Sequence, residues 1–324
     1  MNAHQTIEVQ PPDITRYRDG NTGVDYVHVF DSGVAGPTAM VQALTHGNEY
    51  CGALALDFLL RSRLRPARGK LIVAFANVEA HARFSFDDPH ASRYVDEDYN
   101  RVWGDEALSG PRDSVELRRA RALRPFVDAA DVLLDIHSMH EPCRPIMVCG
   151  KDGELGGGGH KSAALAREIG LPADLLVDTG HPAGLRMIER GGFGDPASPR
   201  RAVLIECGQH WERGAEAIAR DSMLRFLAAA GVVAFDAIAP RLSVPLPGRQ
   251  RLVRVTEAVV ARSMDFRFHV PIVGLGVVEQ AGTLIASDGP QQWHAPYENT
   301  VLVMPSLQHL KPGNTQVRLG RFVD

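Results

Sequence analysis

The chain has 324 residues, of which 44% are hydrophobic and 23% are charged, as expected for a globular protein with one large domain and a smaller one. Its formal net charge is -4 at pH 7, and it contains no long basic tract with interleaved aromatic residues. These properties argue against nucleic acid as a partner.

The N-terminal segment has no basic stretch followed by an apolar one, so we expect no signal peptide. The most apolar later segment, Leu227 to Phe235, is much shorter than the roughly 20 residues that a membrane-spanning helix needs. We therefore expect a cytoplasmic protein with no membrane partner. The cysteines lack the paired spacing of a zinc ribbon or a redox motif, and we expect free thiols at Cys51, Cys143, Cys149 and Cys207.

In chain order, the first predicted elements are a strand, a helix and a strand. Residues 37 to 46 form a short apolar run, apolar residues recur at helical spacing between residues 49 and 64, and residues 70 to 77 form a second apolar run. A strand, a helix and a strand over this short length form a βαβ unit, which predicts parallel neighbouring strands.

The same pattern continues further along the chain. A basic helical pattern over residues 114 to 130 precedes a strand that begins at Asp131, and another strand begins at Arg201. A long amphipathic helix follows over residues 212 to 231, with Gly231 placed to end it. Residues 81 to 110 show little apolar periodicity, and such a long loop is commonly functional or disordered. The predicted fold class is α/β, with helices flanking a parallel sheet.

After a proline-rich stretch around residues 240 to 247, the sequence changes to short β-rich runs. These runs begin near residues 251, 266, 283, 299 and 316. We place a boundary near residue 242, with a large domain over residues 1-241 and a small all-β domain over residues 242-324.

Polar side chains lie at or just after the ends of four predicted strands. They are, in chain order, His46 with Glu49, Asn77, His137 and Glu206. In open parallel sheets, ligands bind beyond the carboxyl ends of the strands. We therefore expect these side chains to meet at one edge of the sheet.

Two imidazoles and a carboxylate suit a catalytic zinc ion, which needs about three protein ligands and one open position. The predicted ligands are His46, Glu49 and His137, and Asp135 can hold the His137 ring in one tautomer. The first pair alone is weak support, because a glutamate three residues after a histidine also occurs as a helix cap. His140 could compete with His137, but it is better explained as a solvated loop histidine.

Four motifs in this order, THGNE, RYVDEDYNRVW, DIHS and IECGQ, resemble the succinylglutamate desuccinylase and aspartoacylase family, itself similar to the zinc carboxypeptidases. The resemblance covers about residues 38 to 240, and the β-rich segment also looks like the family's C-terminal part. It implies a mostly parallel mixed sheet flanked by helices, with a small all-β domain packed near the active site. It places one Zn²⁺ per chain on His46, Glu49 and His137.

The resemblance also implies roles for other residues. Glu206 would activate the zinc-bound water, Arg93 would contact the polarised carbonyl oxygen, and Asn100 with Arg101 would bind a substrate carboxylate. The chemistry is coherent because zinc acidifies water, a carboxylate can pass the proton to a leaving amine, and cations stabilise an oxyanion. Asp96 and Asp98 are interpreted as ordering the loop, and Arg186 is a weaker candidate for a second carboxylate.

We therefore predict a zinc-dependent deacylase that hydrolyses the amide bond of a small N-acyl amino acid or related amide. The partner would be a small molecule bearing a carboxylate. The sequence does not decide between a monomer and a homo-oligomer. The alternatives are a metallocarboxypeptidase acting on short peptides and a non-catalytic metal-binding homologue. The glycine run from Gly156 to Gly159 is interpreted as a flexible loop, because His160 stands where a phosphate-binding loop needs glycine.

Overall fold

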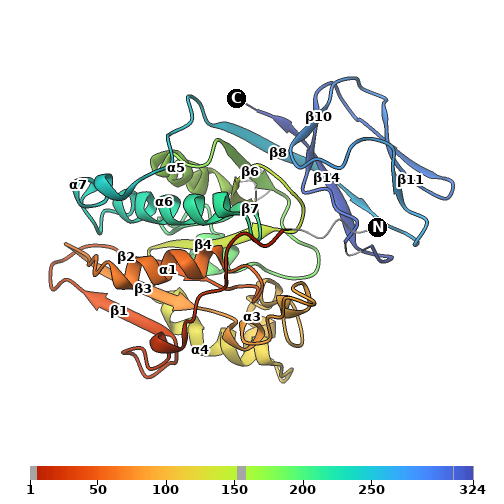
Figure 1. Cartoon of the computed structure of the whole chain (residues 1–324). Helices are drawn as coiled ribbons and strands as arrows, with labels where there is room; N and C mark the ends of the chain where they lie inside the picture. Colours follow the sequence, from red (N-terminus) through yellow and green to blue (C-terminus); the bar gives the residue numbers. More distant parts are fainter. Residues whose placement is uncertain (1–5, 152–157, 309, 324) are drawn as a thin grey trace.

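The computed structural model describes residues 6-151, 158-308 and 310-323. Within these residues, a mixed sheet of eleven strands runs through the molecule in the order β1-β3-β2-β4-β7-β5-β6-β8-β14-β13-β10 (Figure 1). From β3 to β8 the neighbouring strands are parallel, except that β5 runs antiparallel to β7. The predicted α/β fold with a mostly parallel mixed sheet is confirmed.

The strands of this sheet are β1 Val27–Asp31, β2 Thr38–Ala43, β3 Lys70–Phe75, β4 Val132–Met139, β5 Ile146–Lys151, β6 Asp174–Asp178, β7 Arg201–Gln209, β8 Arg251–Val260, β10 Gly276–Val278, β13 Thr300–Val303 and β14 Thr315–Phe322.

Helices cover both faces of the central sheet (Figure 1). The longer ones are α1 Cys51–Arg61, α4 Val115–Ala129, α5 Gly159–Ile169 and α6 Arg213–Ala229. Helices α1, α5 and α6 pack on one face around Leu56, Leu165 and Phe226, whereas α4 packs on the other face through Leu117. The three predicted helices are confirmed, and α6 ends just before Gly231, whose φ is +72°.

Shorter elements connect these helices and strands. They are α2 Val78–His81, α3 Asp105–Ser109 and α7 Phe235–Ile238, with 3-10 turns at η1 Thr15–Tyr17, η2 Ala91–Arg93, η3 Tyr99–Arg101, η5 Met187–Glu189, η6 Gly191–Phe193 and η7 Ala239–Arg241.

The strands β1, β5 and β6 and the helix α5 were not predicted from the sequence. Strands β5 and β6 contain six and five residues, and apolar runs this short do not distinguish a strand from a buried helix. Helix α5 begins at Gly159, the last residue of the glycine run, where no side-chain cap marks its start. Gly156 and Gly157 lie outside the described residues, so the predicted loop is not tested there; Gly158 precedes α5 and Gly159 is its first residue.

The C-terminal segment is rich in β-strands, as predicted. Four of its strands, β8, β14, β13 and β10, extend the main sheet beyond β6. A second sheet is formed by β9 Arg267–Phe268, β11 Leu284–Asp288 and β12 Gln291–His294, around its own small apolar core. The main sheet thus continues across residue 242, and the domain boundary there stays a prediction.

Three adjacent parallel strands bring the candidate site residues to one edge of the sheet. The order β2, β4, β7 places the turn after β2 beside the end of β4, and His137 of β4 pairs in register with Glu206 of β7. Parallel strands share their carboxyl edge, so residues from distant parts of the sequence meet there.

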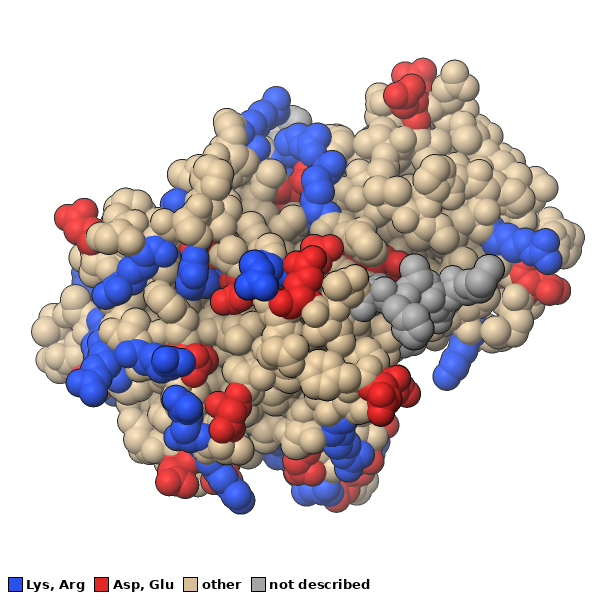
Figure 2. Space-filling view, in the orientation of Figure 1, with Lys and Arg blue, Asp and Glu red and all other residues tan. Residues whose placement is uncertain are grey.

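The surface carries mixed charge. On the face shown in Figure 2, Lys and Arg side chains lie among Asp and Glu side chains over the helical part of the molecule. No described helix is long and apolar enough to cross a membrane. The four cysteines are free, and three of them are buried.

Candidate metal centre and active site

His46, Glu49 and His137 converge in one buried group. Glu49 lies between the two histidines, with Oε1 2.7 Å from His46 Nδ1 and Oε2 2.9 Å from His137 Nδ1. The exposed fractions of the three residues are only 3%, 2% and 1%. Their donor atoms lie within 4.8 Å of one another, so one ion could contact all three.

The outer nitrogen of each histidine faces a carboxylate. His46 Nε2 is 3.1 Å from Asp98 Oδ1, and His137 Nε2 is 2.8 Å from Asp135 Oδ2. Coordination through Nδ1 would leave the proton of each ring on Nε2, where the carboxylates of Asp98 and Asp135 can accept a hydrogen bond from it. The sequence predicted the role of Asp135, whereas the contact between Asp98 and His46 was not predicted.

The charges within this group depend on one another. Burial disfavours ionised Glu49, but His46 and His137 outweigh it and hold the pKa of Glu49 well below its usual range. Burial also disfavours charged His137, yet Asp135 and Glu49 raise the pKa of His137 well above its usual value. The buried carboxylate therefore stays ionised, and a cation bound among these residues would take the place of the proton that His137 holds in its absence.

The turn after β2 packs tightly against the loop that carries Arg93. Leu44 has a φ of +61°, which is costly for a residue with a side chain and turns the chain sharply out of the strand. A Cβ on Gly47 would lie 2.4 Å from both His81 N and Ser92 O. Gly47 N also donates to Arg93 O at 3.0 Å. Only glycine allows this close approach of two backbones.

We expect Gly47→Ala to separate these two segments. The atoms nearest to the new methyl group belong to backbone, so relief requires the loop to move, and the free energy of unfolding should fall by about 1-3 kcal/mol. Denaturant unfolding measures this change. Gly214→Ala in α6 is the matched control, because a Cβ there meets nothing within 4 Å. Equal unfolding midpoints for the two variants would contradict the packing argument.

Glu206 lies beside the metal-binding group. Burial raises the pKa of Glu206 to about 8. The positive charges of His137 and Arg93 oppose this shift, whereas the negative charges of Glu49 and Asp135 reinforce it. Its Oε2 atom is buried and has no hydrogen-bond partner among the described residues. A carboxyl group with a pKa near neutrality can both accept and return a proton.

Arg93 connects the metal-binding group to its loop. Its Nη1 donates to Glu49 Oε1 at 3.2 Å, and its Nη2 donates to Asp98 Oδ2 at 3.2 Å. The same Nη2 lies 2.9 Å from His46 Nε2. Because 21% of the side chain stays exposed, the guanidinium reaches from the buried group toward solvent.

The loop over residues 81 to 110 is ordered by a buried carboxylate of α4. Glu116 accepts hydrogen bonds from the backbone N–H groups of residues 95, 96 and 97 and from Asn77 Nδ2. Asp96 accepts from Val115 N at 2.8 Å, in agreement with its predicted role in ordering the loop. Asn77 therefore supports this loop and caps α2, and the importance of Glu116 was not predicted.

The turn η3 presents Asn100 and Arg101. Asn100 is buried, and its Oδ1 accepts from Met187 N at 3.2 Å, which leaves the amide nitrogen as the group that can face a ligand. Arg101 Nη1 donates to Asn100 O at 2.7 Å, and 21% of its side chain is exposed.

Positive charge accumulates around Arg101. Burial lowers the pKa of Arg101 to about 10; Asp98 opposes this shift, and the nearby Arg93, Arg186 and Arg318 reinforce it. A pKa lowered in this way means that the protonated form lacks sufficient negative charge nearby. A carboxylate ligand would relieve this surplus of positive charge.

Arg186 is already paired. Its Nη1 and Nη2 each donate to Asp178 at 2.7 Å, and Nη2 also donates to Glu189 at 2.6 Å. It is therefore poorly suited to bind a second carboxylate. Arg318, which lies on β14 in the C-terminal segment, makes no ion pair with any residue that the structure describes, and sequence reasoning did not select it.

A buried His–Glu–His group at the carboxyl edge of a mostly parallel α/β sheet, beside a glutamate and several arginines, is typical of metal-dependent hydrolases. Residues 35–230 match the model of the Succinylglutamate desuccinylase/Aspartoacylase catalytic domain. The chain therefore belongs to this family of deacylases. A search of the curated proteins finds no match.

Solved structures share the fold over nearly the whole chain. Succinylglutamate desuccinylase from Vibrio cholerae has a TM-score of 0.67 and 16% identity, and the match covers 93% of this chain and 86% of the other. For the product-bound ectoine utilization protein EutE (DoeB) from Ruegeria pomeroyi, the TM-score is 0.63, the identity 18%, and the coverage 91% and 88%. A succinylglutamate desuccinylase/aspartoacylase from Rhodobacter sphaeroides has a TM-score of 0.64 and 18% identity, and the match covers 92% of this chain and 89% of the other.

Proposed function

We propose that this protein is a zinc-dependent deacylase that hydrolyses the amide bond of a small N-acyl amino acid or related amide. The observation that carries the proposal is the buried group of His46, Glu49 and His137 with Glu206 beside it. Family membership supports deacylation, and two of the similar solved structures reported above are named as a succinylglutamate desuccinylase and a succinylglutamate desuccinylase/aspartoacylase.

The donor set fits Zn²⁺. His46, Glu49 and His137 would hold it, because two imidazoles and a carboxylate are a common ligand set of catalytic zinc, and each histidine has a carboxylate on its outer nitrogen. When bound, the ion supplies Lewis acidity that makes water more acidic and polarises a carbonyl oxygen.

The chain's own side chains would carry out the proton transfer and stabilise charge. Glu206 takes a proton from the attacking water and returns it to the leaving amine, which a pKa near 8 favours. The guanidinium of Arg93 donates to the carbonyl oxygen as negative charge develops there. Asp98 and Glu49 hold Arg93 in this orientation before the substrate arrives.

The substrate carboxylate would lie against Asn100 and Arg101. The planar fork of Arg101 matches a carboxylate in two hydrogen bonds, and the Asn100 amide adds a neutral donor. A cavity of about 340 Å³ adjoins this position, with His181, Gly184 and Leu185 in its lining. Gly184 packs directly on the backbone of Arg101, so the cavity and the arginine are neighbours. The volume suits a small ligand.

Arg318 lies near enough to Arg101 for their charges to act on each other, and we infer that it also donates to the substrate carboxylate. We expect Arg318→Ala to raise KM by roughly 10-100-fold with little change in kcat, because a charged hydrogen bond lost equally from substrate and transition state affects binding alone. Steady-state kinetics measure both constants. Arg267→Ala on the distant strand β9 is the control and should match wild type. An unchanged KM for Arg318→Ala would show that Arg318 does not contribute to substrate binding.

The proposal is tested by a hydrolysis screen of zinc-loaded protein against N-acetyl, N-succinyl and N-formyl amino acids beside short peptides. We expect turnover of at least one N-acyl amino acid, abolished by a chelator and restored by Zn²⁺. A clear preference for peptides would favour a metallocarboxypeptidase. Absence of turnover with every substrate would favour a non-catalytic metal-binding protein.

A further inference from the structure

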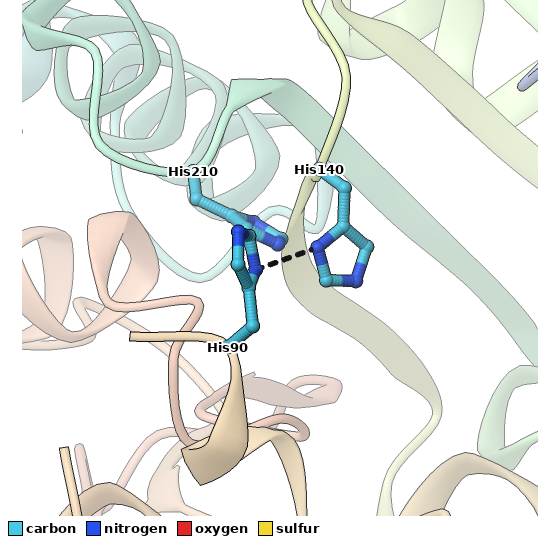
Figure 3. A group of neighbouring side chains, drawn as sticks. All are labelled: His90, His140 and His210. Atoms are coloured by element: carbon cyan, nitrogen blue, oxygen red, sulfur yellow. Dashed lines mark hydrogen bonds between the residues drawn. The ribbon is translucent and has the colours of Figure 1, made fainter. Parts of the chain in front are cut away.

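A second group of three histidines lies near the candidate active site. His90 precedes η2, His140 follows β4 and His210 follows β7, and their rings face one another (Figure 3). Their donor atoms lie within 4.8 Å of one another, the same limit that encloses the His46 group. The Nδ1 atoms of His90 and His140 are 3.0 Å apart.

The spacing is close to that of metal ligands. Two nitrogens bound to one tetrahedral zinc at about 2.0-2.1 Å lie roughly 3.3 Å apart, so the contact between His90 and His140 needs only a small adjustment. The ring centroids of His140 and His210 are 4.5 Å apart, which lets the third nitrogen approach the same point by ring rotation.

One nitrogen in this group has no partner in the described structure. His210 is fully buried, and its Nε2 makes no hydrogen bond with any described residue. Its Nδ1 lies 2.9 Å from Ser138 Oγ, which can accept a hydrogen bond from a protonated Nδ1. Nε2 then carries the lone pair, and a buried unsatisfied polar atom is costly unless a ligand completes it.

The surroundings also favour a cation. Asp88 and Glu141 lie close enough to His90 for their negative charge to act on it. Trp211 packs 5.0 Å from the His90 ring and 5.5 Å from the His210 ring, measured between centroids, and forms an apolar wall. His90 and His140 are only partly buried, so an ion and a water ligand can enter from that side.

We propose that His90, His140 and His210 form a second metal site, distinct from the His46 group, that binds a divalent transition metal such as Zn²⁺ through three imidazole nitrogens. Three imidazoles without a carboxylate select zinc, copper or nickel over magnesium or calcium, which prefer oxygen ligands. A water completes the fourth position. This site goes beyond the proposed function and does not depend on it.

Metal binding at this second site would restrict the motion of the loop over residues 81 to 110, which carries Arg93. His90 O accepts from Arg93 N at 3.2 Å, so His90 lies at the start of the segment that leads to Arg93, Asp98 and Arg101. The two groups also meet at Ser138, whose Oγ contacts His210 and whose backbone N donates to Glu49 Oε2 at 3.2 Å. The ion would tie this loop to the ends of β4 and β7.

The test counts bound metal. Protein freed of metal by a chelator is saturated with Zn²⁺, desalted and analysed by mass spectrometry for metal, in the wild type and in His90→Ala/His140→Ala. We expect the double variant to hold one equivalent of zinc less than the wild type. Both histidines are partly exposed, so the variant should fold, and circular dichroism checks this. His28→Ala, at another partly buried histidine, should lose none.

A variant that lacks the first metal group tests the second metal site separately from the proposed function. In His46→Ala/Glu49→Ala, where the other group is removed, we expect one equivalent of zinc, lost when His90→Ala/His140→Ala is added. Cobalt absorption in this background should disappear with the same change. Trypsin cleavage of the wild-type loop should slow at least 3-fold on zinc addition and stay unchanged in His90→Ala/His140→Ala. Equal zinc content with and without His90 and His140 in both backgrounds would overturn the site.

Discussion

Replacing Glu206 with glutamine should lower kcat by about 10²-10⁴-fold while the zinc content stays at the wild-type level. The amide has the shape of the carboxylate but cannot accept a proton from water. Since Glu206 is outside the group of His46, Glu49 and His137, its substitution leaves the metal donors in place. The measurement is kcat on the best N-acyl amino acid from the screen, together with zinc analysis.

The matched control for this prediction is Glu257→Gln, an exposed glutamate of β8, which should keep wild-type kcat. If Glu206→Gln kept both its zinc and its full activity, another group would have to carry the proton and the proposed mechanism would be wrong. Loss of zinc in this variant would instead place Glu206 among the ligands.

Replacing Arg93 with methionine should lower kcat by about 10²-10³-fold, because the developing oxyanion loses a charged donor. The substitution also removes the contacts with Glu49 and Asp98, so zinc affinity must be measured beside kcat. Arg93→Lys keeps the charge without the planar fork, and we expect it to recover part of the rate.

A structural role for Arg93 would give a different result. In that case Arg93→Met would lose zinc, and excess Zn²⁺ would restore the rate to that of the wild type. A rate that stays low at full zinc occupancy supports direct contact with the reacting carbonyl. Arg267→Met on β9 provides the control for a general effect of removing an arginine.

Much of the fold could be predicted because burial leaves a clear pattern. Strands β2, β3, β4 and β7 are buried on both faces and read as continuous apolar runs, and α4 and α6 have one apolar face. Strand β1 has a half-exposed pattern at the sheet edge, and its signal was too weak to identify. The antiparallel direction of β5 depends on its connections and cannot be read from its own six residues.

For the candidate site, the sequence by itself determined the chemical types of the donors and their positions at strand ends, because strand length and hydrophobicity are local properties. Only the tertiary structure decided which side chains from distant parts of the sequence contact these donors. Asp98 reaches His46 across 52 residues, and His90 reaches His140 across 50. Such contacts depend on how the turns beyond β2, β4 and β7 fold over the sheet edge, which is fixed by packing of distant segments such as Glu116 against residues 95 to 97.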